Sequence, residues 1–247
     1  MMYFEDKNNK IYYEKYGNKK DVIIILPGWG FTRPTFNYLI DNLSRNNTVY
    51  IIDYPEFGKS KLKLENQTIY DYTNSIYKLI KKEKIKNPTI IAHSFGGRIT
   101  TLLSAKLNLK IKQLILIDIA SIKPKKTITQ IIKKYLFKIL KHIYMPKWLF
   151  SYFASTDYAN LNPKLRSTFK NIVNEDLTKY LKNIKEKTLI IWGENDNATP
   201  IKDAYKIRKE IKKSELIIYK SASHYSYLDY PYLTLKIIEE FLKEKEA

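Results

Sequence analysis

The 247-residue chain contains no cysteine, three histidines and no long apolar run. The absence of cysteine excludes disulfide-stapled scaffolds, thiolate metal sites and cysteine nucleophiles. The histidines, His93, His142 and His224, are too few and too scattered to suggest a zinc site, so no metal or organic cofactor is expected. The longest apolar run, Val22–Leu26, is far shorter than the roughly 20 residues of a membrane-spanning helix. The chain does not open with a basic stretch followed by an apolar one, so a cytoplasmic protein without a signal peptide is expected.

Arginine is also scarce, although the formal net charge is +19. Readout of bases and bidentate binding of phosphate favour arginine, whose planar fork matches those acceptors. The lysines are spread along the whole chain, and lysine, isoleucine, asparagine and tyrosine, which share AT-rich codons, are abundant together. The charge is therefore attributed to genome composition, and no nucleic-acid partner is expected. Contact with an anionic membrane surface is a weaker alternative, and the chain is expected to be a monomer or a homodimer.

Short β-branched apolar runs alternate with segments of helical periodicity, which is typical of a buried parallel sheet covered by helices on both faces. The N-terminal segment Met2–Tyr16 alternates instead and predicts a hairpin. The expected strands are Val22–Leu26, Thr48–Asp53, Thr89–Ala92, Ile111–Asp118, Thr188–Trp192 and Leu216–Tyr219. Five helices are expected. The first contains Phe36–Leu43, the second starts at a capping box of Thr68 and Asp71, and the third spans Gly96–Leu107. The fourth starts at Pro200 with Thr199 as N-cap, and the fifth starts at Pro231.

This alternation stops after the fourth of these strands. From about Ser121 to Lys187 the chain has helical patterns and no convincing strand, the clearest pattern being Ile128–Ile143 with lysines on its opposite face. The expected fold class is therefore α/β, a mostly parallel doubly wound sheet with an inserted helical cap. Residues 1–120 form the first part of the core, residues 121–187 the cap, and residues 188–247 the second part of the core.

A nucleophile elbow is predicted where the third strand turns into its helix. Ser94 is flanked by Ala92 and Gly96, and a sharp strand-to-helix turn needs such small residues because backbones approach closely there. The turn presents the hydroxyl at a helix N-terminus, whose dipole favours a developing oxyanion. An ordinary helix start with a capping serine is the alternative interpretation.

Two further residues complete a candidate triad. A serine hydroxyl needs a base that is oriented by a third group, and on this kind of sheet the chain order is serine, acid, histidine. Asp196 and His224 have that order, and each lies just past the carboxyl end of an expected strand, where ligands bind in open α/β sheets. We therefore predict Ser94, Asp196 and His224 as nucleophile, acid and base. Asp118, which ends another strand, is the alternative acid.

An oxyanion hole is expected beside the nucleophile. The N–H of Phe95, which follows Ser94 directly, supplies the first donor. The second is expected in the loop after the first parallel strand, Pro27–Gly30, where the N–H of Trp29 is the candidate.

With these motifs the chain resembles the α/β-hydrolase superfamily, over about residues 11–242. The residues that carry the resemblance are Leu26–Gly30, Asp53–Ser60, His93–Gly97, Trp192–Asp196 and Ser223–His224. Within the superfamily it looks most like capped bacterial serine hydrolases, which include small carboxylesterases and meta-cleavage-product hydrolases. The resemblance implies a cap between the strands that end at Asp118 and begin near Thr188.

The resemblance also implies a class of substrate. Dehalogenases and epoxide hydrolases of this fold carry an aspartate at the elbow, which Ser94 argues against. Carbon–carbon hydrolases usually have asparagine before the nucleophile and tryptophan after the base, where this chain has His93 and Tyr225. A serine hydrolase that cleaves a small or medium acyl ester through an acyl-enzyme is therefore expected. Carbon–carbon cleavage and a lipid or thioester substrate remain alternatives, and the three triad residues argue against a non-catalytic receptor.

Aromatic residues of the expected cap are candidates for an apolar acyl pocket, with packing of the cap on the core as the alternative. The pocket candidates are Trp148, Phe150, Phe153 and, next to the expected base, Tyr225. Two arginines, Arg98 and Arg166, could meet a substrate carboxylate or form ordinary surface ion pairs.

Overall fold

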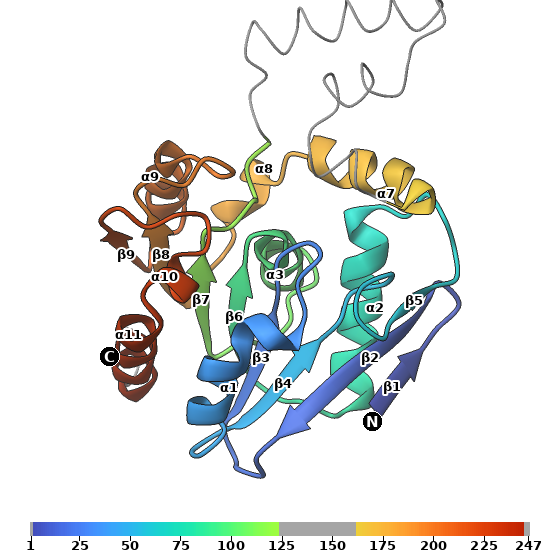
Figure 1. Ribbon diagram of the computed structural model, residues 1–247, viewed down its shortest axis with the longest axis horizontal. Helices are drawn as coiled ribbons and strands as arrows, with labels where there is room; N and C mark the ends of the chain where they lie inside the picture. The colour runs from blue at the N-terminus through green and yellow to red at the C-terminus, as the bar shows by residue number, and fades with distance from the viewer. Residues whose placement is uncertain (1, 124–161, 245–247) are drawn as a thin grey trace, which may run out of the picture.

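The computed structural model describes residues 2–123 and 162–244. Within them a nine-stranded sheet has the strand order β1-β2-β4-β3-β6-β7-β8-β9, and β5 pairs with β2 (Figure 1). The strands from β4 to β9 in that order are parallel, whereas β1, β2 and β5 pair antiparallel. The strands are β1 Met2–Glu5, β2 Asn9–Tyr16, β3 Val22–Leu26, β4 Thr48–Ile52, β5 Lys61–Leu62, β6 Thr89–His93, β7 Gln113–Ile117, β8 Lys187–Gly193 and β9 Ser214–Tyr219.

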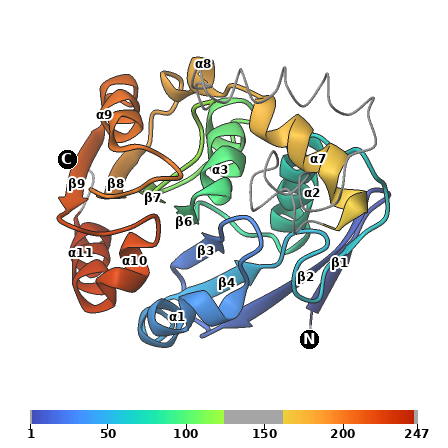
Figure 2. The ribbon, with the colours of Figure 1, turned by 45° about the horizontal axis from the view of Figure 1, so that its top comes forward.

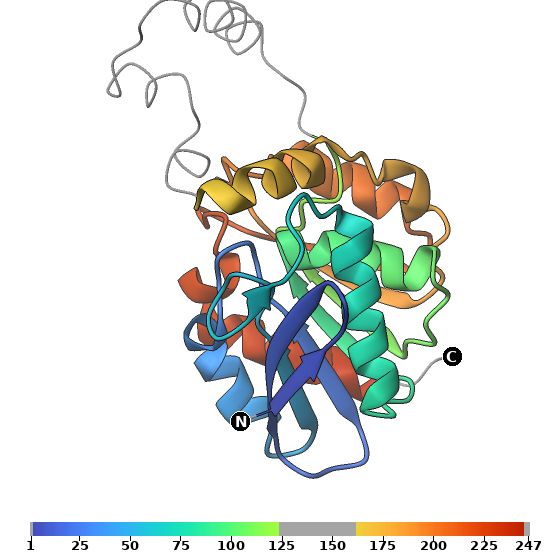
Figure 3. The same ribbon diagram turned by 90° about the vertical axis from the view of Figure 1, so that its right-hand side faces the viewer.

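Helices cover both faces of this sheet (Figures 1 and 3). Side chains of α2, α3, α8 and α9 pack in one apolar cluster with one face of the strands, and those of α1 and α11 pack in a second cluster with the other face. The helical elements are η1 Arg33–Phe36, α1 Asn37–Leu43, α2 Ile69–Lys82, α3 Phe95–Ala105, α7 Pro163–Asn174, α8 Thr178–Leu181, α9 Ile201–Glu210, α10 Ser226–Asp229 and α11 Pro231–Lys243.

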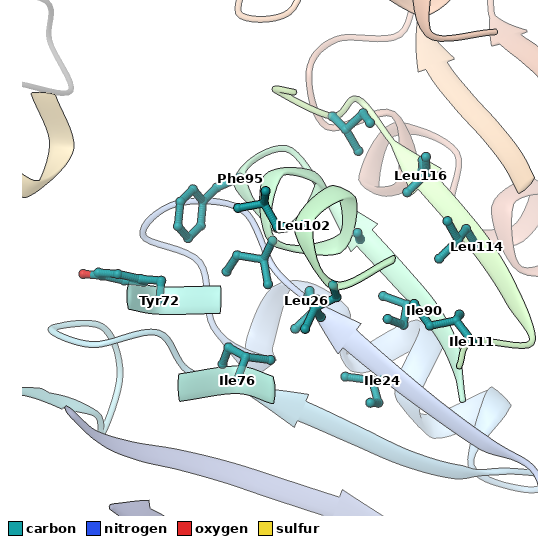
Figure 4. Close-up of a cluster of buried hydrophobic side chains, with 14 of the residues drawn as sticks. Ile24, Leu26, Tyr72, Ile76, Ile90, Phe95, Leu102, Ile111, Leu114 and Leu116 are labelled. Atoms are coloured by element: carbon teal, nitrogen blue, oxygen red, sulfur yellow. The ribbon is translucent and has the colours of Figure 1, made fainter. Parts of the chain in front are cut away.

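The two clusters divide the strand residues by their parity. Ile24 and Leu26 of β3 lie with the α2 and α3 side chains (Figure 4), whereas Ile23 and Ile25 face α1 and α11. Successive side chains of a strand point to opposite faces of a sheet, so a run buried on both sides must be apolar throughout. This is the reason why the continuous run Val22–Leu26 forms a central strand.

Most of the expected elements are present. Each expected parallel strand is found, with bounds that differ by at most two residues at either end, and β1 and β2 form the N-terminal hairpin. The capping box of α2 is also confirmed, because Thr68 Oγ1 accepts from the Asp71 N–H at 3.3 Å and Asp71 Oδ2 accepts from the Thr68 N–H at 2.8 Å. One prediction is wrong: the N-cap of α9 is Pro200, and the Thr199 hydroxyl bonds to Asp196 instead.

The expected insertion is described in part. Between β7 and β8, residues 118–123 and 162–186 contain α7 and α8 and no strand. Both helices lie at the side of the sheet where the parallel strands have their carboxyl ends (Figures 1 and 2). The predicted helix Ile128–Ile143 and the pocket candidates Trp148, Phe150 and Phe153 lie outside the described residues. Among the helices that are described, none is long and apolar enough to cross a membrane.

Candidate active site

The predicted elbow is a strained turn between β6 and α3. Ser94 has φ 47° and ψ −110°, a conformation in the left-handed half of backbone space that a non-glycine residue rarely adopts. Gly96 is close to β3, because a Cβ atom at this position would lie 2.0 Å from the carbonyl oxygen of Leu26. The small residue two positions after Ser94 is therefore a steric requirement of the turn.

The three predicted triad residues form one hydrogen-bonded chain. Ser94 Oγ lies 2.9 Å from His224 Nε2, and His224 Nδ1 lies 2.8 Å from Asp196 Oδ2. The Asp196 side chain has no exposed surface, and the His224 side chain is 14% exposed. With its Nδ1–H donated to the carboxylate, the neutral imidazole has its Nε2 lone pair free to accept the serine proton.

Three groups of the loop after β8 fix the Asp196 carboxylate. Its Oδ1 accepts from the N–H groups of Ala198 and Thr199, both at 2.8 Å, and its Oδ2 accepts from the Thr199 hydroxyl at 2.5 Å. Burial by itself raises the pKa of Asp196, but hydrogen bonds and the attraction to His224 outweigh it and hold that pKa below its ordinary value. The carboxylate is thus kept ionised beside the imidazole.

Asp118, the alternative acid, lies in the same region with different partners. Its Oδ1 accepts from the Gly193 N–H at 2.8 Å, and its Oδ2 accepts from the N–H of Ser226 at 3.2 Å and from its hydroxyl at 2.6 Å. Burial raises the pKa of Asp118 to about 7. Asp196, and not Asp118, is therefore the carboxylate on His224 Nδ1.

The two oxyanion candidates lie next to each other. The Trp29 ring meets the Phe95 ring edge-on with centroids 5.0 Å apart, so the loop after β3 contacts the start of α3. Neither backbone N–H donates to a carbonyl among the residues that the structure describes.

His93 also belongs to the site, although its sequence pattern predicts no role there. Its ring is fully buried, and Nε2 lies 2.9 Å from the carbonyl oxygen of His224, so Nε2 carries the proton. Burial lowers the pKa of His93 to about 3, which keeps it neutral. A Cβ atom on Gly28 would lie 2.7 Å from His93 Nδ1. His93 therefore contacts both the loop of His224 and the loop that follows β3. In the sequence, the only sign of this packing is the glycine at position 28, where a larger residue would meet the His93 ring.

The remaining candidates have mixed outcomes. Tyr225, of the proposed pocket, is 37% exposed, and its ring lies 5.3 Å from that of Phe31 and 5.4 Å from that of His224. Arg98 is buried, so it does not form the predicted surface ion pair, and its side chain bonds to backbone carbonyls. Its guanidinium donates to the carbonyl oxygen of Ala120 at 2.5 Å, and to two carbonyls at the end of α7 and just after it, those of Ile172 and Glu175.

No group of three or more metal-ligating side chains is found within residues 2–123 and 162–244. The described side chains just past the carboxyl ends of β6, β8 and β9 are a hydroxyl, a carboxylate and an imidazole joined by hydrogen bonds, a set that can carry out acyl transfer.

Comparisons with known proteins agree with this fold. Residues 21–144 and 149–231 match the model of the alpha/beta hydrolase fold family. The pimeloyl (acyl-carrier protein) methyl ester esterase of Wigglesworthia glossinidia brevipalpis is 29% identical, over 90% of this chain and 93% of that protein. A putative esterase/lipase 2 of Mycoplasma genitalium is 25% identical, over 95% and 93% of the two chains. The crystal structure of MGS-M2, an alpha/beta hydrolase enzyme from a Medee basin deep-sea metagenome library, has a TM-score of 0.80 at 21% identity and covers 100% of this chain and 98% of that one. The chain therefore belongs to the α/β-hydrolase fold family, and it is a hydrolase.

Proposed function

We propose that this hydrolase cleaves carboxylic esters of small or medium acyl groups, with Ser94 as nucleophile, His224 as base and Asp196 as acid. The observation that carries the proposal is the unbroken chain of hydrogen bonds from Ser94 Oγ through the imidazole to the Asp196 carboxylate, with distances of 2.9 Å and 2.8 Å. Such a chain activates a hydroxyl that is a poor nucleophile at its free pKa.

The proposed reaction has two halves. Ser94 Oγ attacks the ester carbonyl carbon while His224 Nε2 takes the hydroxyl proton, and the tetrahedral intermediate collapses to an acyl-serine as the imidazolium returns that proton to the leaving alkoxide. A water molecule then attacks the acyl-serine as His224 takes one of its protons, and the second tetrahedral intermediate collapses to the carboxylic acid as the imidazolium returns that proton to Ser94 Oγ. Asp196 stabilises the imidazolium in both halves without taking its proton.

In the same proposal the N–H groups of Trp29 and Phe95 bind the oxyanion. Phe95 is the first residue of α3, so its N–H is one of the unpaired donors at a helix N-terminus and lies at the positive end of the helix dipole. Loss of one such donor costs about 10²–10³ in kcat in a comparable site.

Esters are favoured as substrates by the names of two relatives, a methyl ester esterase and a putative esterase/lipase. Carbon–carbon cleavage is disfavoured, because His93 and Tyr225 stand where carbon–carbon hydrolases of the fold usually have asparagine and tryptophan. Residues 121–187 are proposed as the cap over the acyl site.

The experiment is a panel of p-nitrophenyl esters of increasing acyl length, with a thioester and a meta-cleavage product added. Wild type and Ser94→Ala are compared, together with Ser104→Ala, a control that also removes a hydroxyl from the region of α3. Labelling by a fluorophosphonate is expected at Ser94 in the wild type and in Ser104→Ala, and is expected to be absent in Ser94→Ala. Equal labelling of Ser94→Ala and wild type would show that the nucleophile lies elsewhere.

A further inference from the structure

Asp118 is a buried carboxylate that the proposed reaction does not use. It follows β7 directly, has no exposed surface, and adopts φ 48°, which is unfavourable for a residue with a side chain. Its two carboxylate oxygens accept three hydrogen bonds, from the Gly193 N–H and from the N–H and hydroxyl of Ser226. A residue held in this backbone conformation with all its acceptors directed at two other loops is a candidate for a specific task.

The donors belong to the two loops that carry the proposed acid and base. Gly193 is the last residue of β8 and begins the loop that leads to Asp196. Ser226 is the first residue of α10, two positions after His224. Thr199 adds a third connection, since its hydroxyl lies 3.2 Å from the Asp118 carbonyl oxygen and 2.5 Å from Asp196 Oδ2.

We propose that Asp118 is a positioning residue, whose carboxylate holds the Asp196 loop and the His224 loop at the separation that their hydrogen bond requires. This inference rests on the proposed function for its catalytic consequence. Asp196 and His224 come from different loops, so nothing in their local sequence fixes the 2.8 Å between them. One planar carboxylate bonded to a backbone N–H in each loop supplies that constraint.

The raised pKa of Asp118 shows that its ionised form lowers the stability of the fold, so a gain in stability does not explain why a carboxylate is buried here. Burial and the repulsion of Asp196 raise its pKa from 3.8 to about 7, while Ser226, Gly193 and His224 favour its ionised form. The negative charge of Asp118 also contributes to the raised pKa values of Tyr219 and Tyr227, in which burial is the largest cause. The folded protein therefore binds a proton at Asp118 that the unfolded chain releases, and the contribution of Asp118 to stability falls as the pH rises from about 4 to about 7. Above that window the protein holds a costly buried charge, and the ionised carboxylate is the form that accepts all three hydrogen bonds.

The test uses Asp118→Asn in the full chain, with Asp53→Asn as the matched control. Asparagine has the same shape, and its oxygen can still accept from Gly193, but its NH₂ group then faces the Ser226 N–H, which has lost its acceptor. Asp53 is likewise a buried aspartate directly after a parallel strand, and its carboxylate accepts from the Lys59 N–H at 3.0 Å, within its own loop. Both variants lose one buried carboxylate, and only Asp118→Asn releases the triad loops.

Three readouts separate positioning from stability. Asp118→Asn is expected to lower kcat about 10²-fold, the effect of a misplacement of about 1 Å, with KM little changed. It is also expected to slow fluorophosphonate labelling of Ser94, and to shift or broaden the low-field proton resonance of His224 Nδ1–H. Asp53→Asn is expected to leave all three unchanged. A folded Asp118→Asn protein with wild-type kcat and an unshifted resonance would overturn the proposal.

Two further outcomes are distinguished. If Asp118→Asn does not fold, Ser226→Ala removes one of the three hydrogen bonds and is expected to lower kcat several-fold and to shift the resonance; unchanged values in that variant would likewise overturn the proposal. If the wild type fails to label at Ser94, the proposed function fails. The resonance still reports the Asp196–His224 hydrogen bond in that case, so the positioning of the two loops is judged on its own.

Discussion

Substitutions at Ser94 should separate the strain of the elbow from its chemistry. In most helices alanine is more stable than glycine, but Ser94 has φ 47° and ψ −110°, where a Cβ atom is disfavoured. Relief of such a conformation is worth about 1–3 kcal/mol, and the greater chain entropy of unfolded glycine costs about 0.5–1 kcal/mol. Both Ser94→Gly and Ser94→Ala lose the bond to His224, so that term cancels. Ser94→Gly is therefore expected to be more stable than Ser94→Ala by about 0.5–2 kcal/mol.

Urea denaturation at equal m-values measures this difference. Ser75, a buried serine in the middle of α2, provides the control pair, for which Ser75→Gly is expected to be about 1 kcal/mol less stable than Ser75→Ala. Neither Ser94 variant should hydrolyse esters, so stability and turnover move independently. If Ser94→Gly were less stable than Ser94→Ala by the same amount as in the Ser75 pair, the elbow would hold no strain and the reasoning would be wrong.

Three other substitutions test the surroundings of the triad. Asp196→Asn should lower kcat by about 10⁴-fold, because the amide favours the wrong tautomer of His224, and stopped-flow ester hydrolysis would detect it. His93 has a folded pKa of about 3 against an ordinary 6.5, so the unfolded chain takes up the proton first, and the contribution of His93 to stability should fall as the pH drops below about 6.5. His93→Gln should remove this contribution, seen in urea titrations as the difference between wild type and variant, and the same pH slope in both proteins would contradict it. Gly28→Ala should destabilise the wild type, because its Cβ would meet His93 Nδ1 at 2.7 Å, but should cost much less in a His93→Ala background, and an additive double-mutant cycle would speak against this contact.

The features that could be predicted from the sequence depend on short local patterns. The apolar run of β3, the capping box of α2 and the small residues around Ser94 each follow from requirements that a few neighbouring residues reveal. The function of Thr199 could not be inferred in this way. A threonine before Pro200 has the pattern of an N-cap, and the competing partner, Asp196, is recognised only when its loop is folded back.

Long-range partners account for the other differences. Asp118 accepts from Ser226, 108 positions further along the chain, and His93 bonds to a carbonyl 131 positions away. Arg98 bonds to carbonyl oxygens, which every residue carries, so no side-chain pattern could indicate its partners. The sequence contains these residues but no local sign of what they meet.

The contacts of Arg98 have a consequence for how this protein can vary in length. One guanidinium joins the helix of the elbow to Ala120, before the insertion, and to Ile172, where the chain returns towards the sheet. The two ends of the intervening stretch are thereby held together on a part of the fold that does not depend on it. Since the entropy of closing a loop grows slowly with its length, stretches of different length can be grafted between these ends at little cost. A change in that stretch would then leave the hydrogen-bonded chain of Ser94, His224 and Asp196 in its place.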